Sequence, residues 1–549
     1  MTEKLNEPCL VQTVQGFSVS YKNKLLYSKY NPKRSILEII QKTEILSGTI
    51  ILCFSPVLSY GIEELSQKLA KDSLIFGLEA DPLLYNLAKE TAEKLDKAKT
   101  LHYTLLKPGE LFTLPEKIFS LCKNGTFRRV IALECSGGYS FNADFYSRLF
   151  NAARDSVSQF WKNRVTLIKF GKKYCINIFK NINLISSSDY TIEEIKVFKP
   201  IIVIGAGESA SETLKTIKEK RDNFFLITVD AALKTLKSLN IKTDAAICEE
   251  SQAVITKAFT GCSSLFDFLF LSTTVNSSVA KINPQKNIFY TPIFSDVAFL
   301  KSLKANDIID YTEEPLGSVG LSATEIALKI RANTSVPVFV TGLDFSFSCG
   351  KTHATSSFHD STKRCFSTKI NGIENFSSSF SGDSKKVKGI NNKTVITTTP
   401  LFNYAELFKF RFSNKINLFD ARNFGVSLGI PHKEPLSDDI IKIENKVFIQ
   451  KIECSKKQTR ITKTKEWLLN EKNALNEIKD IFIGKTQFTS EKEKMQKLSD
   501  LITPREYLYL HFPDGYKVDF SQSFLNRIRI ELDYFLKIIN LDFESFANK

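Results

Sequence analysis

The 549-residue chain lacks the sequence features of secreted and membrane-spanning proteins. Its opening, MTEKLNEPCL, has no basic stretch followed by an apolar one, so a secretory signal peptide is not expected. No segment approaches the roughly 18 uninterrupted apolar residues of a membrane span. The ten cysteines include no CxxC pair and no zinc-like spacing, which fits reduced thiols better than a disulfide framework. We therefore expect a cytoplasmic protein without a membrane partner.

The chain also lacks a local concentration of arginine and aromatic residues, which is typical of sequence-reading nucleic-acid domains. Its formal net charge of +15 comes mostly from lysines spread over the sequence. A basic chain favours anionic partners such as nucleotides, phosphosugars and acidic protein surfaces. Nucleic acid is not expected among these partners.

A chain of this length is too long for one compact core, so several domains are expected. The patterns predict an N-terminal α/β domain of degenerate Rossmann-like type over 1–190. A central doubly wound, Rossmann-like domain is predicted over 191–432, and a helical domain over 433–549. The overall fold class is therefore α/β.

The N-terminal region has the outline of a nucleotide-binding βαβ unit. The buried-strand run TIILCFSP precedes a helical pattern, and a second strand, SLIFGLEADP, ends in Glu79 and Asp81. However, the turn FSPVLSYG contains one late glycine in place of a glycine-rich fingerprint. A structural α/β domain is favoured over a cofactor site.

The central region alternates buried-strand segments with helical ones, which predicts a mostly parallel, doubly wound sheet. The expected strands are IIVIGAG, FFLITVD, DAAICEE, FLFLSTT, NIFYTP and VPVFVTGLDFS. The stretch 355–386 is rich in Ser, Lys and Gly and is expected to be a long polar loop of the lid or acceptor-binding kind.

The C-terminal region carries two amphipathic stretches, WLLNEKNALNEIKDIF and SFLNRIRIELDYFLKIINLDF. Each places apolar residues at spacings of 3, 4 and 7, as expected for helices. Such stripes form the core of a bundle or a surface for a partner. No catalytic constellation is evident there.

In a parallel sheet, ligands bind outside the carboxyl ends of the strands. Gly205, Gly207 and Ser209 follow the first central strand and precede a helix. The free N–H groups and the dipole at such a helix start favour a phosphate or carboxylate. A tight turn between strand and helix needs glycine in any case, so a purely structural role stays open.

Carboxylates end the next two strands, with Asp230 after FFLITVD and Glu249 and Glu250 after DAAIC. They could hold ribose hydroxyls, a divalent metal or a base, although Asp230 could simply cap the following helix. Gly317 and Ser318 enter another helix and form a second anion-binding corner. Two such corners in one sheet could hold two anionic groups of one ligand.

The stretch VTGLDFSFSCGKTHA contains three candidate reactive residues. Asp344 could orient a base or bind a hydroxyl, Lys351 could bind phosphate, and His353 titrates near neutrality. The GKT sequence lacks the first glycine of a P-loop and follows a late strand, so a Walker motif is rejected.

Four segments resemble, in their order and spacing, the central domain of motility accessory factors: IIVIGAGESASETL, ITVDAALKTLKSLNIKTDAAI, GSVGLSATEIAL and VFVTGLDFSFSCGKTHA. The N-terminal segments and the helical tail also look like those of the family. Members are bacterial glycosyltransferases that attach nonulosonic acids, of the pseudaminic or legionaminic type, to Ser and Thr of flagellin. Their central domain is itself similar to bacterial sialyltransferases.

The resemblance implies a CMP-activated sugar as donor, flagellin as acceptor, and a role in flagellar assembly and motility. Gly205, Gly207 and Ser209 would contact the CMP phosphate and ribose, and Gly317 and Ser318 the donor carboxylate or cytidine. The full set expected to bind the nucleotide sugar is Gly205, Gly207, Ser209, Asp230, Glu249, Thr273, Gly317, Ser318 and Lys351.

The general base is expected to be His353 or Asp344, a choice made on chemistry and not by alignment with the family. The reaction requires no metal cofactor, although the nearby carboxylates could recruit Mg²⁺.

Two alternatives to the glycosyltransferase remain. The same domain resembles archaeal 6-hydroxymethyl-7,8-dihydropterin pyrophosphokinase, which needs ATP and Mg²⁺. A non-catalytic flagellin chaperone is the other, because Glu208 replaces the usual proline and the strand end CEESQ departs from the family pattern.

Overall fold

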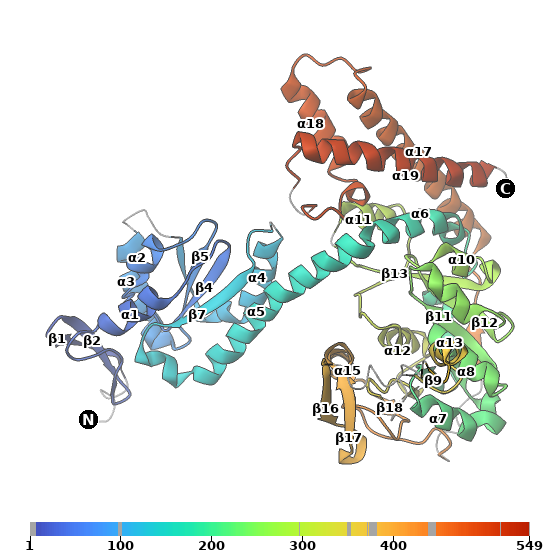
Figure 1. The fold of residues 1–549 in the computed structure, drawn as a ribbon, viewed down its shortest axis with the longest axis horizontal. Helices are drawn as coiled ribbons and strands as arrows, with labels where there is room; N and C mark the ends of the chain where they lie inside the picture. The colour runs from blue at the N-terminus through green and yellow to red at the C-terminus, as the bar shows by residue number, and fades with distance from the viewer. Residues whose placement is uncertain are drawn as a thin grey trace. The chain divides into compact units, whose positions relative to one another are not determined.

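The computed structural model describes residues 7–96, 102–123, 125–295, 297–347, 353–370, 372, 382–437, 446–515 and 518–547. The chain forms two compact units (Figure 1). The first comprises Met1–Phe170 with Leu510–Asp519, and the second comprises Gly171–Tyr509 with Phe520–Lys549. The three domains expected from the sequence, with boundaries at 190/191 and 432/433, stay a prediction.

The first unit contains a parallel sheet in the order β6-β5-β4-β7 and an antiparallel sheet β1-β2-β3. Its strands are β1 (Cys9–Thr13), β2 (Gly16–Tyr21), β3 (Lys24–Leu25), β4 (Thr49–Phe54), β5 (Leu74–Leu78), β6 (Tyr103–Leu106) and β7 (Arg129–Glu134). Its helices are α1 (Arg34–Lys42), α2 (Ile62–Gln67), α3 (Pro82–Asp96), α4 (Leu114–Cys122) and α5 (Ala143–Thr166).

The two acids at the end of β5 bond to protein groups. Glu79 accepts hydrogen bonds from the Ser55 hydroxyl at 2.6 Å and from the Tyr146 hydroxyl at 3.2 Å. Asp81 accepts one from Tyr21 at 2.9 Å. Both carboxylates therefore stabilise packing at the carboxyl end of the small parallel sheet.

The last piece of the first unit comes from near the end of the chain. Arg164 on α5 is buried, and its guanidinium donates to the carbonyls of Leu510 at 3.1 Å and Phe512 at 2.7 Å. The segment 510–519 is thus bonded to a helix that ends more than 340 residues earlier in the sequence.

The second unit is built on an eight-stranded parallel sheet in the order β14-β13-β12-β11-β10-β9-β15-β18. Its strands are β9 (Ile201–Ile204), β10 (Phe225–Val229), β11 (Thr243–Cys248), β12 (Phe266–Ser272), β13 (Asn287–Pro292), β14 (Thr312–Glu313), β15 (Val338–Thr341) and β18 (Leu418–Asp420). The predicted α/β fold with a doubly wound parallel sheet is confirmed. All six expected central strands are present, whereas β14 and β18 were not expected.

Two antiparallel pairs complete the strands of this unit, β8 (Ile195–Val197) with β19 (Val447–Ile449) and β16 (Ser384–Lys388) with β17 (Thr394–Thr398). Its helices are α6 (Lys172–Ser186), α7 (Ser209–Ile217), α8 (Leu233–Ser238), α9 (Thr256–Phe259), α10 (Ser277–Ala280), α11 (Ala298–Ala305), α12 (Val319–Ile330), α13 (Phe358–Phe366), α15 (Thr399–Phe412), α17 (Cys454–Phe482), α18 (Glu491–Ile502) and α19 (Gln522–Ala547).

The strand order places a switch point between β9 and β15. Strands β9 to β14 extend the sheet in one direction, and β15 and β18 extend it in the other. All four residues of β9 are fully buried, as expected for a central strand covered on both faces. Ligands bind at such a reversal, outside the carboxyl ends of the two diverging strands.

The expectation of one long polar loop over 355–386 is wrong in part. Residues 358–366 form α13, because the Ser357 hydroxyl accepts a hydrogen bond from the Asp360 N–H at 3.2 Å and caps the helix. Phe358 is buried at its first turn. Strand β16 begins at Ser384, and residues 371 and 373–381 lie outside the described part.

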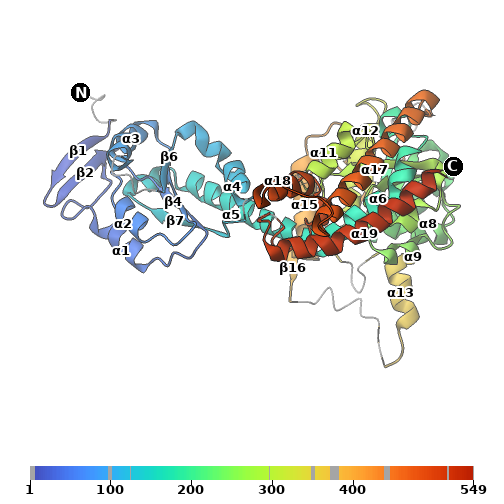
Figure 2. The same cartoon turned by 90° about the horizontal axis from the view of Figure 1, so that it is seen from above.

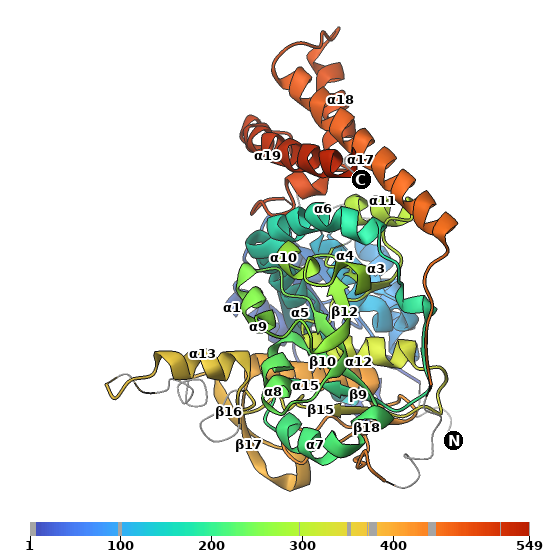
Figure 3. The same ribbon diagram turned by 90° about the vertical axis from the view of Figure 1, so that its right-hand side faces the viewer.

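The two amphipathic C-terminal stretches form α17 and α19, which pack against each other and against α6 (Figures 2 and 3). The ring of Phe179 on α6 lies 5.9 Å from that of Trp467 and 5.7 Å from that of Phe535. Their apolar stripes therefore form core. Across the described residues, no helix is both long enough and apolar enough to pass through a membrane.

Candidate functional site

The turns after β9 and β15 meet at the switch point. The N–H of Gly205 donates to the Thr341 carbonyl and the N–H of Gly207 to the Gly342 carbonyl, each at 2.8 Å. A Cβ atom on Gly205 would lie 2.3 Å from the Gly342 carbonyl oxygen. The backbones approach so closely that only glycine fits, which explains the glycines of this turn.

The start of α7 holds the Asp344 carboxylate. The N–H of Ser209 donates to Asp344 Oδ2 at 3.0 Å, and the Ser209 hydroxyl donates to Oδ1. The same hydroxyl accepts the N–H of Gly342 at 2.9 Å. A Cβ on Gly207 would lie 2.5 Å from Asp344 Oδ2. The turn is thus an anion-holding helix start, and in this structure the anion is a side chain of the protein.

Arg422 lies behind Asp344 and is fully buried. Its guanidinium makes a bidentate ion pair with Asp420, at 2.8 and 2.7 Å, and donates to the Val426 carbonyl at 3.0 Å. Burial raises the pKa of Asp344, and the Arg422 charge and the Ser209 bonds partly offset that rise. Arg422 was not singled out in the sequence, where FDARNFG gives no sign of a buried arginine.

The other two predicted reactive residues are Lys351 and His353. Lys351 lies outside the described residues. The His353 ring stacks on His359 with centroids 4.3 Å apart, and burial together with the neighbouring His359 lowers the pKa of His353 to about 4. The imidazole is therefore neutral at pH 7 and only a weak proton acceptor. Its role as general base stays a prediction.

A second group of carboxyls lies along the same edge of the sheet. Asp230 follows β10, and its Oδ1 accepts the N–H of Ala231 at 2.6 Å. Its Oδ2 is buried without a hydrogen bond of good geometry in the described structure, and the Cys248 thiol lies close to the carboxyl. Burial raises the pKa of Asp230 to about 6. Glu249 follows β11 and accepts a hydrogen bond from Tyr290 at 2.9 Å, and burial raises the pKa of Glu249 as well.

Glu313, at the end of β14, joins this group although it was not identified from the sequence. Both of its carboxyl oxygens are buried and have no hydrogen-bond partner within the described residues. Burial first, and then the charges of Glu249 and Glu325, raise the pKa of Glu313 to about 9. The nearby Ser322 hydroxyl on α12 is also buried, and no well-formed hydrogen bond to it is described. In the sequence, TEEPLG looks like an exposed charged loop.

The remaining predicted site residues are Thr273, Gly317 and Ser318. The Thr273 hydroxyl donates to Thr291 at 3.3 Å, and its carbonyl accepts from Asn181 at 3.2 Å, so both groups join structural networks. Gly317 has a φ of +71°, which favours glycine, and Ser318 directly precedes α12. The contact of Thr273, Gly317 and Ser318 with a nucleotide sugar stays a prediction.

No cluster of three or more His, Cys, Asp or Glu side chains in the described ranges is arranged to hold a metal ion. Asp230, Glu249 and Glu313 therefore share an edge of the sheet without forming a ligand set for a metal.

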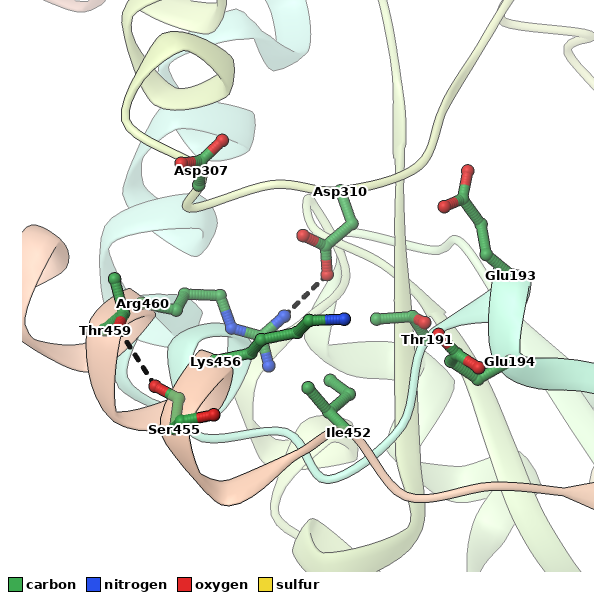
Figure 4. Close-up of a pocket in the computed structure, with 10 residues that line it drawn as sticks. All are labelled: Thr191, Glu193, Glu194, Asp307, Asp310, Ile452, Ser455, Lys456, Thr459 and Arg460. Carbon is green, nitrogen blue, oxygen red and sulfur yellow. Dashed lines mark hydrogen bonds and ion pairs between the residues drawn. The ribbon is translucent and has the colours of Figure 1, made fainter.

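A cavity of about 440 Å³ lies at the start of α17 (Figure 4). Arg460 on its wall is paired with Asp310 at 2.5 Å and donates to the carbonyls of Ser186 and Ser188. The Lys456 side chain extends into it. None of the predicted site residues is among its described lining residues, so it is separate from the switch point.

Known proteins match this chain either in its central part or over nearly its whole length. Residues 172–350 match the family "6-hydroxymethylpterin diphosphokinase MptE-like", a range that includes both switch-point turns. An uncharacterized protein of Treponema pallidum (strain Nichols) is 27% identical over 559 aligned positions, covering 97% of this chain and 95% of the relative.

The solved structure of the MAf glycosyltransferase from Magnetospirillum magneticum AMB-1 has the same fold as this chain. The match has a TM-score of 0.58 at 13% identity and covers 99% of this chain and 91% of that one. The chain is therefore an α/β protein that shares this fold over nearly its whole length. The resemblance to motility accessory factors that the sequence indicates is confirmed at the level of the fold.

Proposed function

We propose that the protein is a glycosyltransferase that moves a nonulosonic acid, of the pseudaminic or legionaminic type, from a CMP-activated donor to Ser or Thr of flagellin. The observation that carries the proposal is a fold match to a MAf glycosyltransferase over 99% of the chain. A parallel sheet with a switch point and buried carboxyls along its carboxyl edge supports a ligand-binding site there.

In this proposal the donor lies along the carboxyl edge, with its phosphate near the starts of α7 and α12. The acceptor hydroxyl attacks the anomeric carbon, the bond from that carbon to the phosphate oxygen breaks, and CMP leaves. Asp344 holds the α7 turn in place, because both of its oxygens accept bonds from Ser209. Asp230 has a buried carboxyl beside the Cys248 thiol and a pKa of about 6, which suits a group that takes the acceptor proton.

The family match of residues 172–350 favours one second candidate, a pterin diphosphokinase. That enzyme would transfer diphosphate from ATP to 6-hydroxymethyl-7,8-dihydropterin with Mg²⁺. The two activities use different substrates, so parallel assays of one preparation separate them. A flagellin-binding chaperone is the third outcome.

The test is the intact mass of flagellin co-expressed with this protein and with a nonulosonic-acid pathway. Sugar-sized mass increments are expected with the wild type and should fall by about 100-fold or more with Asp230→Asn. The matched control is Glu219→Gln on an exposed turn, which should retain full modification. Unmodified flagellin that still binds the protein would contradict the enzyme, and AMP release from ATP and the pterin would favour the kinase.

A further inference from the structure

Two side chains at the carboxyl edge are buried with unmet hydrogen-bonding capacity. Glu313 is only 6% exposed, and neither of its oxygens has a partner in the described part of the chain. Ser322, the fourth residue of α12, is 1% exposed, and its hydroxyl lies close to the carboxyls of Glu249 and Glu313 without a hydrogen bond of good geometry to either. A buried polar group without a partner is costly, so each such group requires an explanation. A ligand that supplies the missing bonds is the explanation we develop.

Glu249 and Ser322 lie within reach of a ligand at the switch point, and Glu313, which ends the edge strand β14, joins them through its contact with Ser322 on α12. Glu249, which is coupled to Glu313 by charge, follows β11, two strands away from β9. Neighbouring strands are about 4.8 Å apart, so β9 and β11 are separated by about 10 Å. Helix α12 packs across β9, β10 and β11 and carries Ser322 over this interval. A nucleotide sugar is long enough to extend from one position to the other.

The charges around Glu313 decide what it can bind. The groups that act on it are the Ser322 hydroxyl and Glu325 on α12, Glu249 after β11, Tyr290 on β13, Tyr311 before β14 and Arg411 on α15. Arg411 is engaged, because it pairs with Glu325 at 3.0 Å and with Glu314 at 2.6 Å. The Glu313 carboxyl is therefore neutral at pH 7. In this form it donates one hydrogen bond and accepts others.

The donor and acceptor set matches an uncharged polar ligand. Glu313 supplies an O–H, Glu249 a carboxylate oxygen, and Ser322 a hydroxyl. The neighbouring Glu249 would repel an anionic group such as a phosphate or a sugar carboxylate, whereas Glu325 is compensated by Arg411. We propose that Glu313, Glu249 and Ser322 form a subsite for the hydroxyl- or amide-bearing part of the ligand, which in the proposed transferase is the side chain or acylamino group of the donor sugar.

This subsite rests on the proposed function, and its test separates the two. Full-length protein is titrated at pH 7.5 with CMP and with CMP-N-acetylneuraminic acid, which adds a carboxylate, hydroxyls and an amide to the same nucleotide. The wild type should bind the sugar nucleotide about tenfold or more tightly than CMP. Glu313→Leu should lose that preference while CMP binding is retained, and Glu313→Gln, which keeps a neutral donor, should retain it.

Two controls accompany these variants. Glu219→Leu, at an exposed position of the same unit away from this edge of the sheet, should keep the wild-type preference. At pH 10 the wild type should lose its preference as Glu313 ionises, whereas Glu313→Gln should keep it. This pH response distinguishes hydrogen bonding by a neutral carboxyl from simple loss of packing, and a preference that grew on ionisation would mean that the subsite takes a cation.

Three results would overturn the inference. Equal affinity of the wild type for both ligands would remove the need for a sugar subsite. An unchanged preference in Glu313→Leu would place the subsite elsewhere while leaving the CMP-dependent transferase intact. Binding of neither ligand would contradict the proposed function itself, and the subsite with it.

Discussion

Asp344 lies 135 residues after Ser209 in the chain, yet its carboxylate accepts both hydrogen-bond donors of that serine. The start of α7 has the glycines and the small residues of an anion site, and an internal anion occupies it. A ligand phosphate at this turn would therefore meet a group of the same charge. Binding there requires that the ligand contact other N–H groups or that Asp344 carry a proton, which its raised pKa makes easier.

Glu313 gives a stability prediction with a defined sign. Its pKa is about 9 in the folded protein and near its ordinary value of 4.5 in the unfolded chain. Between these values the unfolded chain has lost the proton and the folded protein keeps it, so rising pH favours unfolding. The Glu313→Gln variant lacks this effect, and its Tm should exceed that of the wild type by an amount that grows from pH 5 to pH 9, reaching roughly 4 °C.

Scanning calorimetry across that pH range measures the difference. Glu219→Gln is the control, because its carboxylate lies at an exposed position, and its Tm should follow that of the wild type. A constant gap between Glu313→Gln and the wild type at every pH would show that the Glu313 carboxyl ionises normally in the folded protein.

At the scale of elements, the strongly patterned segments could be predicted from the sequence. The buried runs of β9 and β15 and the amphipathic stripes of α17 and α19 need only local information. Strand β14 has two residues and no apolar run, so nothing local indicates it. Glu313 was missed for the same reason, because its burial results from α12 packing over the sheet. The hydrogen bonds between Ser209 and Asp344 likewise depend on the order of the strands in the sheet, which cannot be read from the local sequence.

Because the turns after β9 and β15 are in close contact, a single methyl group added at Gly207 is expected to lower the stability of the protein. In Gly207→Ala the new Cβ would lie 2.5 Å from Asp344 Oδ2 and 2.8 Å from the Gly342 carbonyl oxygen. The turns must separate to admit it, which should cost about 1–3 kcal/mol of unfolding free energy. CMP binding should weaken as well, because both turns border the proposed site.

Urea unfolding and CMP titration of the variant test this prediction. Gly382→Ala in the same unit is the control, since nothing lies within 4 Å of its added Cβ, and its stability should change by less than about 0.5 kcal/mol. A Gly207→Ala protein with wild-type stability and CMP affinity would contradict the close approach of the two turns.

At the scale of the whole molecule, the first unit is discontinuous in sequence. Residues 1–170 are completed by residues 510–519, and Arg164 joins the two pieces through two backbone carbonyls. A fragment that ends at residue 170 would leave this buried guanidinium without those partners. Loss of two charge-assisted hydrogen bonds to a buried group is destabilising, so the fragment is expected to be less stable than the same unit in the full chain.

The bonds of Arg164 predict a local effect in the intact protein. Arg164→Met removes both donors to segment 510–519, and the backbone amides of that segment should exchange their hydrogens about tenfold faster or more. Arg148→Met, an exposed position on the same helix, is the control and should leave exchange there unchanged. Equal exchange in both variants would mean that Arg164 does not hold the segment.

The discontinuity also has a consequence during synthesis on the ribosome. Residues 171–509 must be translated before the segment that completes the first unit appears. At roughly 5–20 residues per second, this interval lasts tens of seconds. During this interval the Arg164 side chain of the nascent first unit lacks the carbonyls of segment 510–519. The surface that this segment contacts in the complete unit is not yet covered by it. The first unit therefore cannot be completed before this interval has passed, however fast its N-terminal part folds.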